Sequence, residues 1–181
     1  MSALTIPDLV VLAMLAEEPM HGYQLNMELE RRDVKDWAGI SRPQVYYSLK
    51  KLHEQKLIAS VNADSGAGPE RQAFSISKKG AKALSDALDE ERWALERTPP
   101  RFLTWMALSM HAEKASLEKL IDKRKQFLES ELAREQITLG EVQRENNAMT
   151  KAGALMISLT IMQFEVELQW LEDARATLCR R

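Results

Sequence analysis

The chain has 181 residues, of which 45% are hydrophobic and 29% are charged, with a formal net charge of -2. This length allows one large domain or two small ones, and the hydrophobic content excludes a disordered chain. The charge excludes a uniformly basic nucleic-acid binder, but folded proteins bind DNA through local basic patches that a net charge does not report.

Two short helices are predicted near the start of the chain. Thr5 suits the N-cap of the first helix, which has Pro7 in its opening turn and ends at residues 17–19. The second helix runs from about residue 22 to residue 32. Its inward-facing residues are expected to include Tyr23, Leu25 and Leu29. Residues 33–40 then act as a turn into a third helix.

The third helix, residues 41–57, combines an apolar stripe with a polar and basic face. Ser41 is a good N-cap, and Pro43 fits the first turn, where a missing N–H costs nothing. The stripe consists of Val45, Leu49 and Leu52. The opposite face is predicted to present Arg42, Gln44, Tyr47, Ser48, Lys50 and Lys51. Such a helix suits the major groove of DNA, although taken alone it fits an ordinary solvated amphipathic helix better.

The segment after the third helix favours the DNA-binding interpretation. The periodicity becomes alternating around residues 58–61 and again at 73–76, with a turn-rich stretch at 62–69 between them. A hairpin directly behind a third helix is a wing, and three short helices with tight connections form a helix-turn-helix. Arg71 in this hairpin is predicted either to reach a minor groove or phosphate, or to form a structural ion pair with Glu70.

A further helix is predicted from Ser77 to Thr98. Lys78 and Lys79 in its first turn oppose the helix macrodipole, and a nearby phosphate would relieve that cost. Both lysines are therefore candidate DNA contacts. Pro99 and the proline after it break the helix. The predicted domains are 1–98, a winged helix-turn-helix, and 99–181, a helical dimerisation domain.

The second domain is predicted to contain a short apolar helix and two long helices, at about 112–146 and 150–178. The last helix carries two apolar stripes. One stripe consists of Leu155, Leu159, Met162, Val166 and Trp170, and the other of Ile157, Ile161, Phe164, Leu168 and Leu171. A single neighbouring helix covers only one stripe, so we predict that a second copy covers the other in a two-fold homodimer.

No catalytic or metal-binding pattern is present. The three histidines lack metal-ligand spacing, and no phosphate loop or nucleophile motif occurs, so neither an enzyme, a metal nor a cofactor is expected. A helical adaptor that binds only protein is the alternative function. A small aromatic or apolar effector would have to use Trp93, Phe102, Trp105, Met106, Met110 or Trp170. The simpler interpretation is that these side chains are core or dimer contacts.

The sequence also favours a cytoplasmic location. Cys179 is the only cysteine, which excludes an internal disulfide and is typical of a reducing compartment. Asp8 interrupts the first apolar run, so we do not expect a signal peptide. The longest uncharged run, residues 152–164, is shorter than the roughly 20 residues that a membrane-spanning helix needs, so no membrane partner is expected.

Several segments together resemble PadR-type transcriptional regulators. Residues 12–25, with His21-Gly22-Tyr23, resemble the opening signature of the family, and residues 45–58 resemble its recognition helix and the exit into the wing. Residues 68–80 are similar to the wing and the next helix. Residues 100–103 and the helix after them are similar to the subgroup related to virulence activators. The chain departs from the family at Tyr47, where proline is common, and at Pro43, near which glycine is frequent.

The resemblance implies a fold that is mainly α with a small β-hairpin, in which a winged helix-turn-helix precedes helical dimerisation elements. It implies a dimeric, ligand-responsive and usually repressing regulator that binds a pseudo-palindromic operator in double-stranded DNA. Tyr46 would then lie at a DNA phosphate, or have its ring half buried with the hydroxyl outward. The His21 triplet would join the first two helices. Relatives also imply a flat aromatic effector held between subunits.

Overall fold

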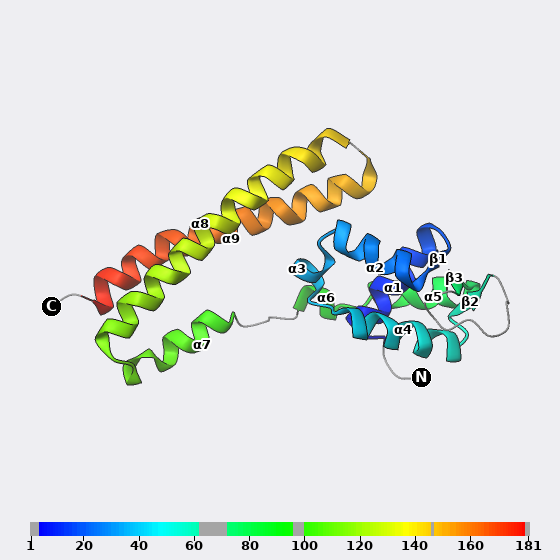
Figure 1. The fold of residues 1–181 in the computed structure, drawn as a ribbon, viewed down its shortest axis with the longest axis horizontal. Helices are drawn as coiled ribbons and strands as arrows, with labels where there is room; N and C mark the ends of the chain where they lie inside the picture. Colours follow the sequence, from blue (N-terminus) through cyan, green and yellow to red (C-terminus); the bar gives the residue numbers. More distant parts are fainter. Residues whose placement is uncertain (1–3, 62–71, 96–99, 146, 180–181) are drawn as a thin grey trace. The chain divides into compact units, whose positions relative to one another are not determined.

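The computed structural model describes residues 4–61, 72–95, 100–145 and 147–179 (Figure 1). Contacts divide the chain into two compact units, Met1–Arg97 and Thr98–Arg181, called here the N-terminal and C-terminal units. The elements of the N-terminal unit are α1 (Ile6–Glu17), β1 (Met20–His21), α2 (Gly22–Arg31), α3 (Val34–Ala38), α4 (Arg42–Glu54), β2 (Ile58–Ser60), β3 (Ala73–Ile76), α5 (Lys78–Leu88) and α6 (Arg92–Leu95).

The first helices begin where the sequence predicts. Thr5 is the N-cap of α1, and Ser41 is the N-cap of α4 with a proline in its first turn. The prediction of a turn at residues 33–40 was wrong, because this segment contains the short helix α3. Gly39 ends this helix in the left-handed region, at φ 65°, which a glycine adopts without strain.

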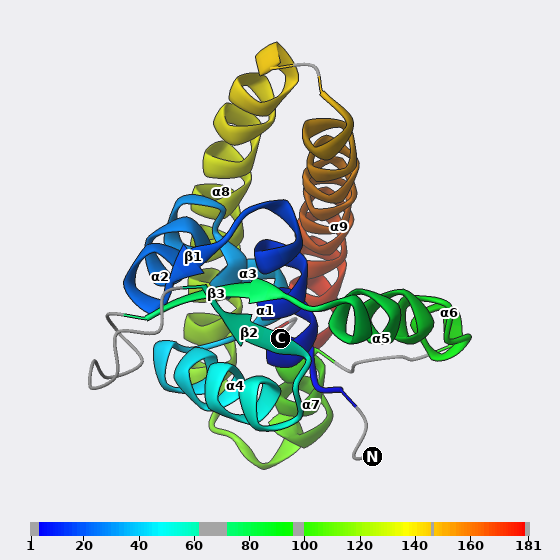
Figure 2. The ribbon, with the colours of Figure 1, turned by 90° about the vertical axis from the view of Figure 1, so that its right-hand side faces the viewer.

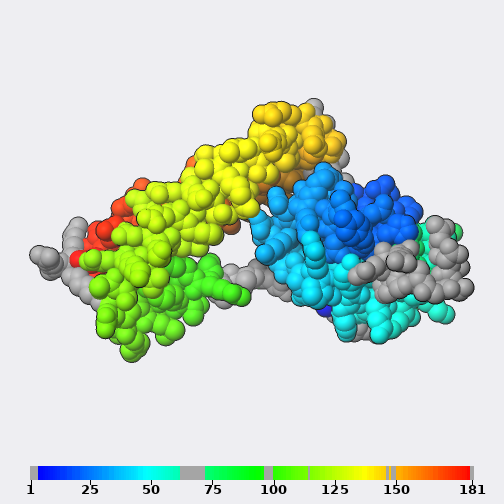
Figure 3. All heavy atoms as spheres, viewed as in Figure 1, coloured from blue at the N-terminus to red at the C-terminus, as the bar shows by residue number. Residues whose placement is uncertain are grey.

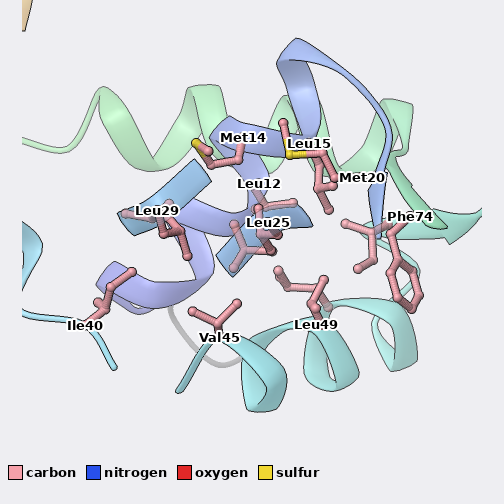
Figure 4. Close-up of a cluster of buried hydrophobic side chains, with 14 of the residues drawn as sticks. Leu12, Met14, Leu15, Met20, Leu25, Leu29, Ile40, Val45, Leu49 and Phe74 are labelled. Carbon is pink, nitrogen blue, oxygen red and sulfur yellow. The ribbon is translucent and has the colours of Figure 1, made fainter. Parts of the chain in front are cut away.

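The core of the N-terminal unit is formed mainly by α1, α2 and α4, with β3 at one side. Figure 4 shows Leu12, Leu25 and Leu49 converging from these three helices. Each of the three is 0% exposed. The prediction for Tyr23 was wrong, since this side chain is 63% exposed. The inner face of α2 consists of Gly22, Leu25, Asn26 and Leu29, a helical spacing that turns Tyr23 outward.

The predicted hairpin is confirmed and belongs to a three-stranded antiparallel sheet of order β1-β3-β2 (Figure 2). Ile58 pairs with Ile76 between β2 and β3, and Met20 pairs with Phe74 between β1 and β3. β1 was not predicted, because a two-residue strand shows no periodicity. Its pairing attaches the base of the wing to the connection between α1 and α2.

The prediction of one continuous helix from Ser77 to Thr98 was wrong beyond residue 88. α5 ends at Leu88, and a separate short helix, α6, follows. The Trp93 indole Nε1–H donates to the Ala87 carbonyl oxygen at 2.7 Å, which folds α6 back onto the end of α5.

The C-terminal unit contains α7 (Arg101–Leu108), the 3₁₀ turn η1 (Ser109–His111), α8 (Lys114–Glu145) and α9 (Ala148–Leu178). α8 and α9 lie side by side along much of their length in Figures 1 and 2. Ile121, Leu128 and Leu171 are buried between them. Among the described residues, no helix is long and apolar enough to cross a bilayer.

Candidate nucleic-acid interface

The outer face of α4 forms part of the surface of the N-terminal unit, as the cyan atoms in Figure 3 show. Tyr47 is 70% exposed, and Lys50 beside it is also exposed. Within the part of the chain that the structure describes, Lys50 has no ion pair. These two side chains therefore have the position that the sequence predicts, on the side of α4 that faces away from the core.

Ser48 and Lys51 do not belong to that face, which corrects the sequence prediction. Ser48 is buried, and the Lys51 Nζ lies 2.6 Å from Oδ2 of Asp8 on α1, with the lysine side chain only 17% exposed. Asp8 itself is fully buried. Because a buried carboxylate needs a partner of opposite charge, Lys51 turns inward toward Asp8.

The Asp8 carboxylate is held by several donors at once. Its Oδ2 accepts hydrogen bonds from the backbone N–H and the hydroxyl of Thr5, each at 2.8 Å, in addition to the Lys51 ammonium. Burial alone would raise the pKa of Asp8, but the hydrogen bonds from Lys51 and Thr5 outweigh it, so the pKa lies below its ordinary value. The ion pair between Asp8 and Lys51 thus joins α1 to α4.

Arg42, at the first position of α4, is paired within the chain. Its guanidinium contacts the Glu30 carboxylate of α2, with a bond from Nε to Oε1 of 3.0 Å. The pKa of Arg42 is raised, first by this hydrogen bond and then by the charge of Glu30. Both side chains remain largely exposed. Arg42 therefore lies on the predicted face but is bound to an acidic partner.

Gln44 and Tyr46 have structural contacts as well. The Gln44 Oε1 accepts hydrogen bonds from the Ser41 backbone N–H and hydroxyl, each at 2.8 Å. These bonds give the donors of the N-cap residue of α4 an acceptor. The Tyr46 ring is partly buried against the hydrophobic core. Of the two predicted positions for Tyr46, the half-buried ring is the one that the structure shows.

Three predicted contacts come from the wing region. Arg71 lies outside the described residues. The Lys79 Nζ donates to the Gln55 carbonyl oxygen at 2.9 Å, at the end of α4. Lys78 is exposed. The hydroxyl of Ser77 accepts from the Gly80 N–H at 3.0 Å, which confirms Ser77 as the cap of α5.

The C-terminal unit contains an open apolar groove between α7 and α8, with a volume of about 330 Å³. Its walls are formed by Phe102, Trp105, Leu120, Lys123, Arg124 and Phe127. The Phe102 and Trp105 rings stack with centroids 5.1 Å apart. The Arg124 guanidinium lies 5.4 Å from the centroids of both Phe102 and Phe127 and pairs in a bidentate manner with Glu167.

Two of the six predicted effector residues line this groove, and four do not. Phe102 and Trp105 lie in it. The Met106 sulfur instead accepts from the Ser109 hydroxyl at 4.0 Å, and Trp93 packs on Ala87 in the N-terminal unit. Arg124 was not predicted as a site residue. Its position within an apolar heptad stripe could have indicated that it contacts buried or aromatic side chains.

The two apolar stripes of α9 differ in exposure as the sequence predicts. Ile157, Ile161, Phe164, Leu168 and Leu171 are partly or fully buried, and the last three pack in the cluster with α8. Every member of the other stripe, Leu155, Leu159, Met162, Val166 and Trp170, is exposed. The C-terminal unit therefore leaves a continuous apolar row of side chains uncovered along one helix.

Comparison with known proteins finds a family match. Residues 11–86, which span α1 through most of α5, match the sequence model of the Transcriptional regulator PadR-like family. Residues 11–86 therefore carry the PadR-like sequence pattern. The match assigns the chain to transcriptional regulators and not to enzymes, as predicted. The sequence model of the family does not extend to the C-terminal unit. The resemblance to the virulence-activator subgroup therefore stays a prediction.

Solved structures of PadR and of other proteins share the fold. The Bacillus subtilis PadR in complex with operator DNA is 16% identical, with a TM-score of 0.77 over 96% of this chain and 99% of that one. The same protein with p-coumaric acid is 15% identical, with a TM-score of 0.74 over 97% of each chain. The protein smu.1604c from Streptococcus mutans UA159 is 18% identical, with a TM-score of 0.69 over 94% and 98%. No curated protein matches the chain.

Proposed function

We propose that this PadR-like chain is a sequence-specific DNA-binding repressor that acts as a homodimer in the cytoplasm and responds to a small aromatic effector. The observation that carries the proposal is the capped helix α4, whose apolar side is fully packed and whose outer side presents Tyr47 and Lys50. Residues 1–98 would bind a pseudo-palindromic operator, and residues 99–181 would form the dimer and hold the effector.

The structure changes which side chains are proposed to touch DNA. We assign the phosphate contacts to Lys50 and Lys78, which are exposed, and keep Tyr47 on the groove-facing side. Ser48 and Lys51 are withdrawn, because Ser48 is buried and the Lys51 ammonium is paired with Asp8. The Bacillus subtilis PadR crystallised with operator DNA supports this kind of partner.

Replacing Lys50 should reduce DNA binding in a way that depends on salt. If Lys50 neutralises one phosphate, Lys50→Ala should weaken binding to all duplexes and lower the slope of log K against log salt by roughly one unit. The measurement is a titration at several salt concentrations with a duplex selected from a random pool. Lys119→Ala, which removes an exposed charge from α8, is the control.

This titration also separates the proposal from a helical adaptor. An adaptor would not retard any duplex, and selection from a random pool would give no enriched sequence. A regulator of the proposed kind should enrich a two-fold symmetric site. Equal slopes for Lys50→Ala and Lys119→Ala would reject α4 as the DNA-facing helix, even if the chain binds DNA.

The exposed row on α9 supports the homodimer. Five apolar side chains along one helix are not expected to remain in water, and a second copy of the same chain covers them through a self-complementary two-fold contact. Val166, in the middle of the row, is 70% exposed. We therefore assign dimerisation to Leu155, Leu159, Met162, Val166 and Trp170.

A charge in this row should dissociate the dimer. In Val166→Glu a carboxylate would have to lose its hydration on association. The dissociation constant of the dimer should therefore rise at least tenfold. Sedimentation velocity over a range of concentrations measures the change. Gln126→Glu adds the same charge to the exposed side of α8 and should leave the dimer intact. A wild-type chain that sediments as a monomer would contradict the assignment directly.

We place the effector site in the groove between α7 and α8. Flat rings fit against the stacked Phe102 and Trp105, and Lys123 on the rim would attract an acidic group. The complex of Bacillus subtilis PadR with p-coumaric acid supports a ligand of this chemistry. The groove replaces the earlier candidates Trp93 and Met106.

Calorimetric titration tests the effector site. p-Coumaric acid should release heat on binding the wild type, and Trp105→Ala should lose that heat because one wall of the groove is removed. Met106→Ala, in the same helix but outside the groove, should bind as the wild type does. Binding that survives Trp105→Ala would move the site elsewhere.

A further inference from the structure

Arg42 occupies a distinctive place on the recognition helix. It is the first residue of α4, and in helix-turn-helix proteins the N-terminal residues of the recognition helix contact base edges. An arginine there can donate two hydrogen bonds to O6 and N7 of a guanine. A cation at a helix N-terminus also opposes the macrodipole, so it gains from an anionic neighbour.

In this structure the anionic neighbour comes from the same chain. Glu30, near the end of α2, accepts from both Nε and Nη2 of Arg42 through its Oε1. Two of the five N–H donors of the guanidinium, one on Nε and one on Nη2, are therefore engaged before DNA arrives. Lys51, another cation of α4, is engaged in the same manner by Asp8.

The two pairs differ in how readily they open. Asp8 is buried and accepts from Thr5 as well, so its pair with Lys51 belongs to the core. Glu30 and Arg42 have side chains that are 60% and 68% exposed, and an exposed ion pair in water is weak. DNA phosphates or a guanine edge can therefore displace Glu30 at moderate cost, whereas they cannot displace Asp8.

We propose that Glu30 is an intramolecular competitor of DNA for Arg42, so that each productive binding event exchanges the Glu30 carboxylate for an acceptor on the duplex. This proposal rests on the proposed DNA-binding function and adds a residue outside the recognition helix that limits DNA affinity. It requires Glu30 to lower DNA affinity only through Arg42, and not through its negative charge alone.

A double-mutant cycle tests this requirement. Affinity for a duplex selected from a random pool is measured for the wild type, Glu30→Gln, Arg42→Gln and the double variant, with circular dichroism to confirm folding. Glu30→Gln should tighten binding about two- to fivefold per subunit in the wild-type background. In the Arg42→Gln background the same change should have no effect.

Glu18→Gln is the matched control, because Glu18 is exposed in the same unit and has no ion pair among the described residues. It removes the same charge and should change affinity less than Glu30→Gln does. Equal gains in both backgrounds, or weaker binding by Glu30→Gln, would overturn the proposal while the DNA-binding function stands. If the wild type bound no duplex at all, the proposed function would fail and this inference with it.

Discussion

Lys51→Met should destabilise the N-terminal unit by about 3–5 kcal/mol, the range expected when one partner of a buried ion pair is removed. The substitution leaves the Asp8 carboxylate buried with only the two donors of Thr5. The free energy of unfolding, measured by urea titration, is the observable. Lys50→Met, the same change one residue earlier on the exposed side, should alter it by less than about 0.5 kcal/mol.

The same variant should also change the pH dependence of stability. In the wild type the folded pKa of Asp8 lies below its ordinary value, so the pair stabilises the fold at pH values above that ordinary pKa and the stabilisation is lost as the pH falls toward the folded pKa. Without Lys51, the largest of the contacts that lower the pKa of Asp8 is lost, while the burial that raises it remains. The difference in stability between the wild type and Lys51→Met should therefore shrink as the pH is lowered through the carboxyl range. Parallel pH profiles for both proteins would contradict the assigned role of Asp8.

Gly80→Ala should destabilise the same unit by about 3 kcal/mol or more, because overpacking against backbone cannot relax as overpacking against a flexible side chain can. A Cβ at position 80 would lie 2.0 Å from the Leu57 carbonyl oxygen and 3.0 Å from Cγ1 of Ile76. That carbonyl also accepts from the Ser77 N–H at 2.9 Å, so α5 would have to move away from the end of α4.

Thermal unfolding followed by circular dichroism measures this effect. The control is Gly140→Ala in α8, where an added Cβ meets nothing within 4 Å and the change should stabilise the helix by about 0.5–1 kcal/mol. Opposite signs for the two substitutions are expected. If both stabilised the chain, the close approach of α5 to the Leu57 backbone would be wrong.

The elements with strong local signals could be predicted from the sequence. Ser41 and Pro43 mark the start of α4, and alternating residues mark the hairpin. Failures occurred where tertiary contacts decide. Trp93 draws α6 back to Ala87 through one hydrogen bond, which no local pattern reveals. The exposure of Tyr23 follows from which side of α2 meets the core.

The internal partners of the candidate DNA contacts were predictable only in part. Arg42, Gln44 and Lys51 were correctly recognised as polar, but each has a partner inside the chain. Two of these partners, Glu30 and Asp8, lie on other helices. A capping-box spacing does link Thr5 to Asp8 and Ser41 to Gln44, so this part of the network could have been predicted.

In the described parts of α8 and α9, ion pairs join Asp122 to Arg175, Arg124 to Glu167 and Lys125 to Glu172. Sliding α9 by one turn would place its charges about 5.4 Å out of position and separate all three pairs together. The hairpin therefore has a single favourable alignment. The apolar row on its outer side consequently has a fixed spacing, and in the proposed homodimer that spacing would allow one copy of the chain to distinguish its own kind from other helical hairpins.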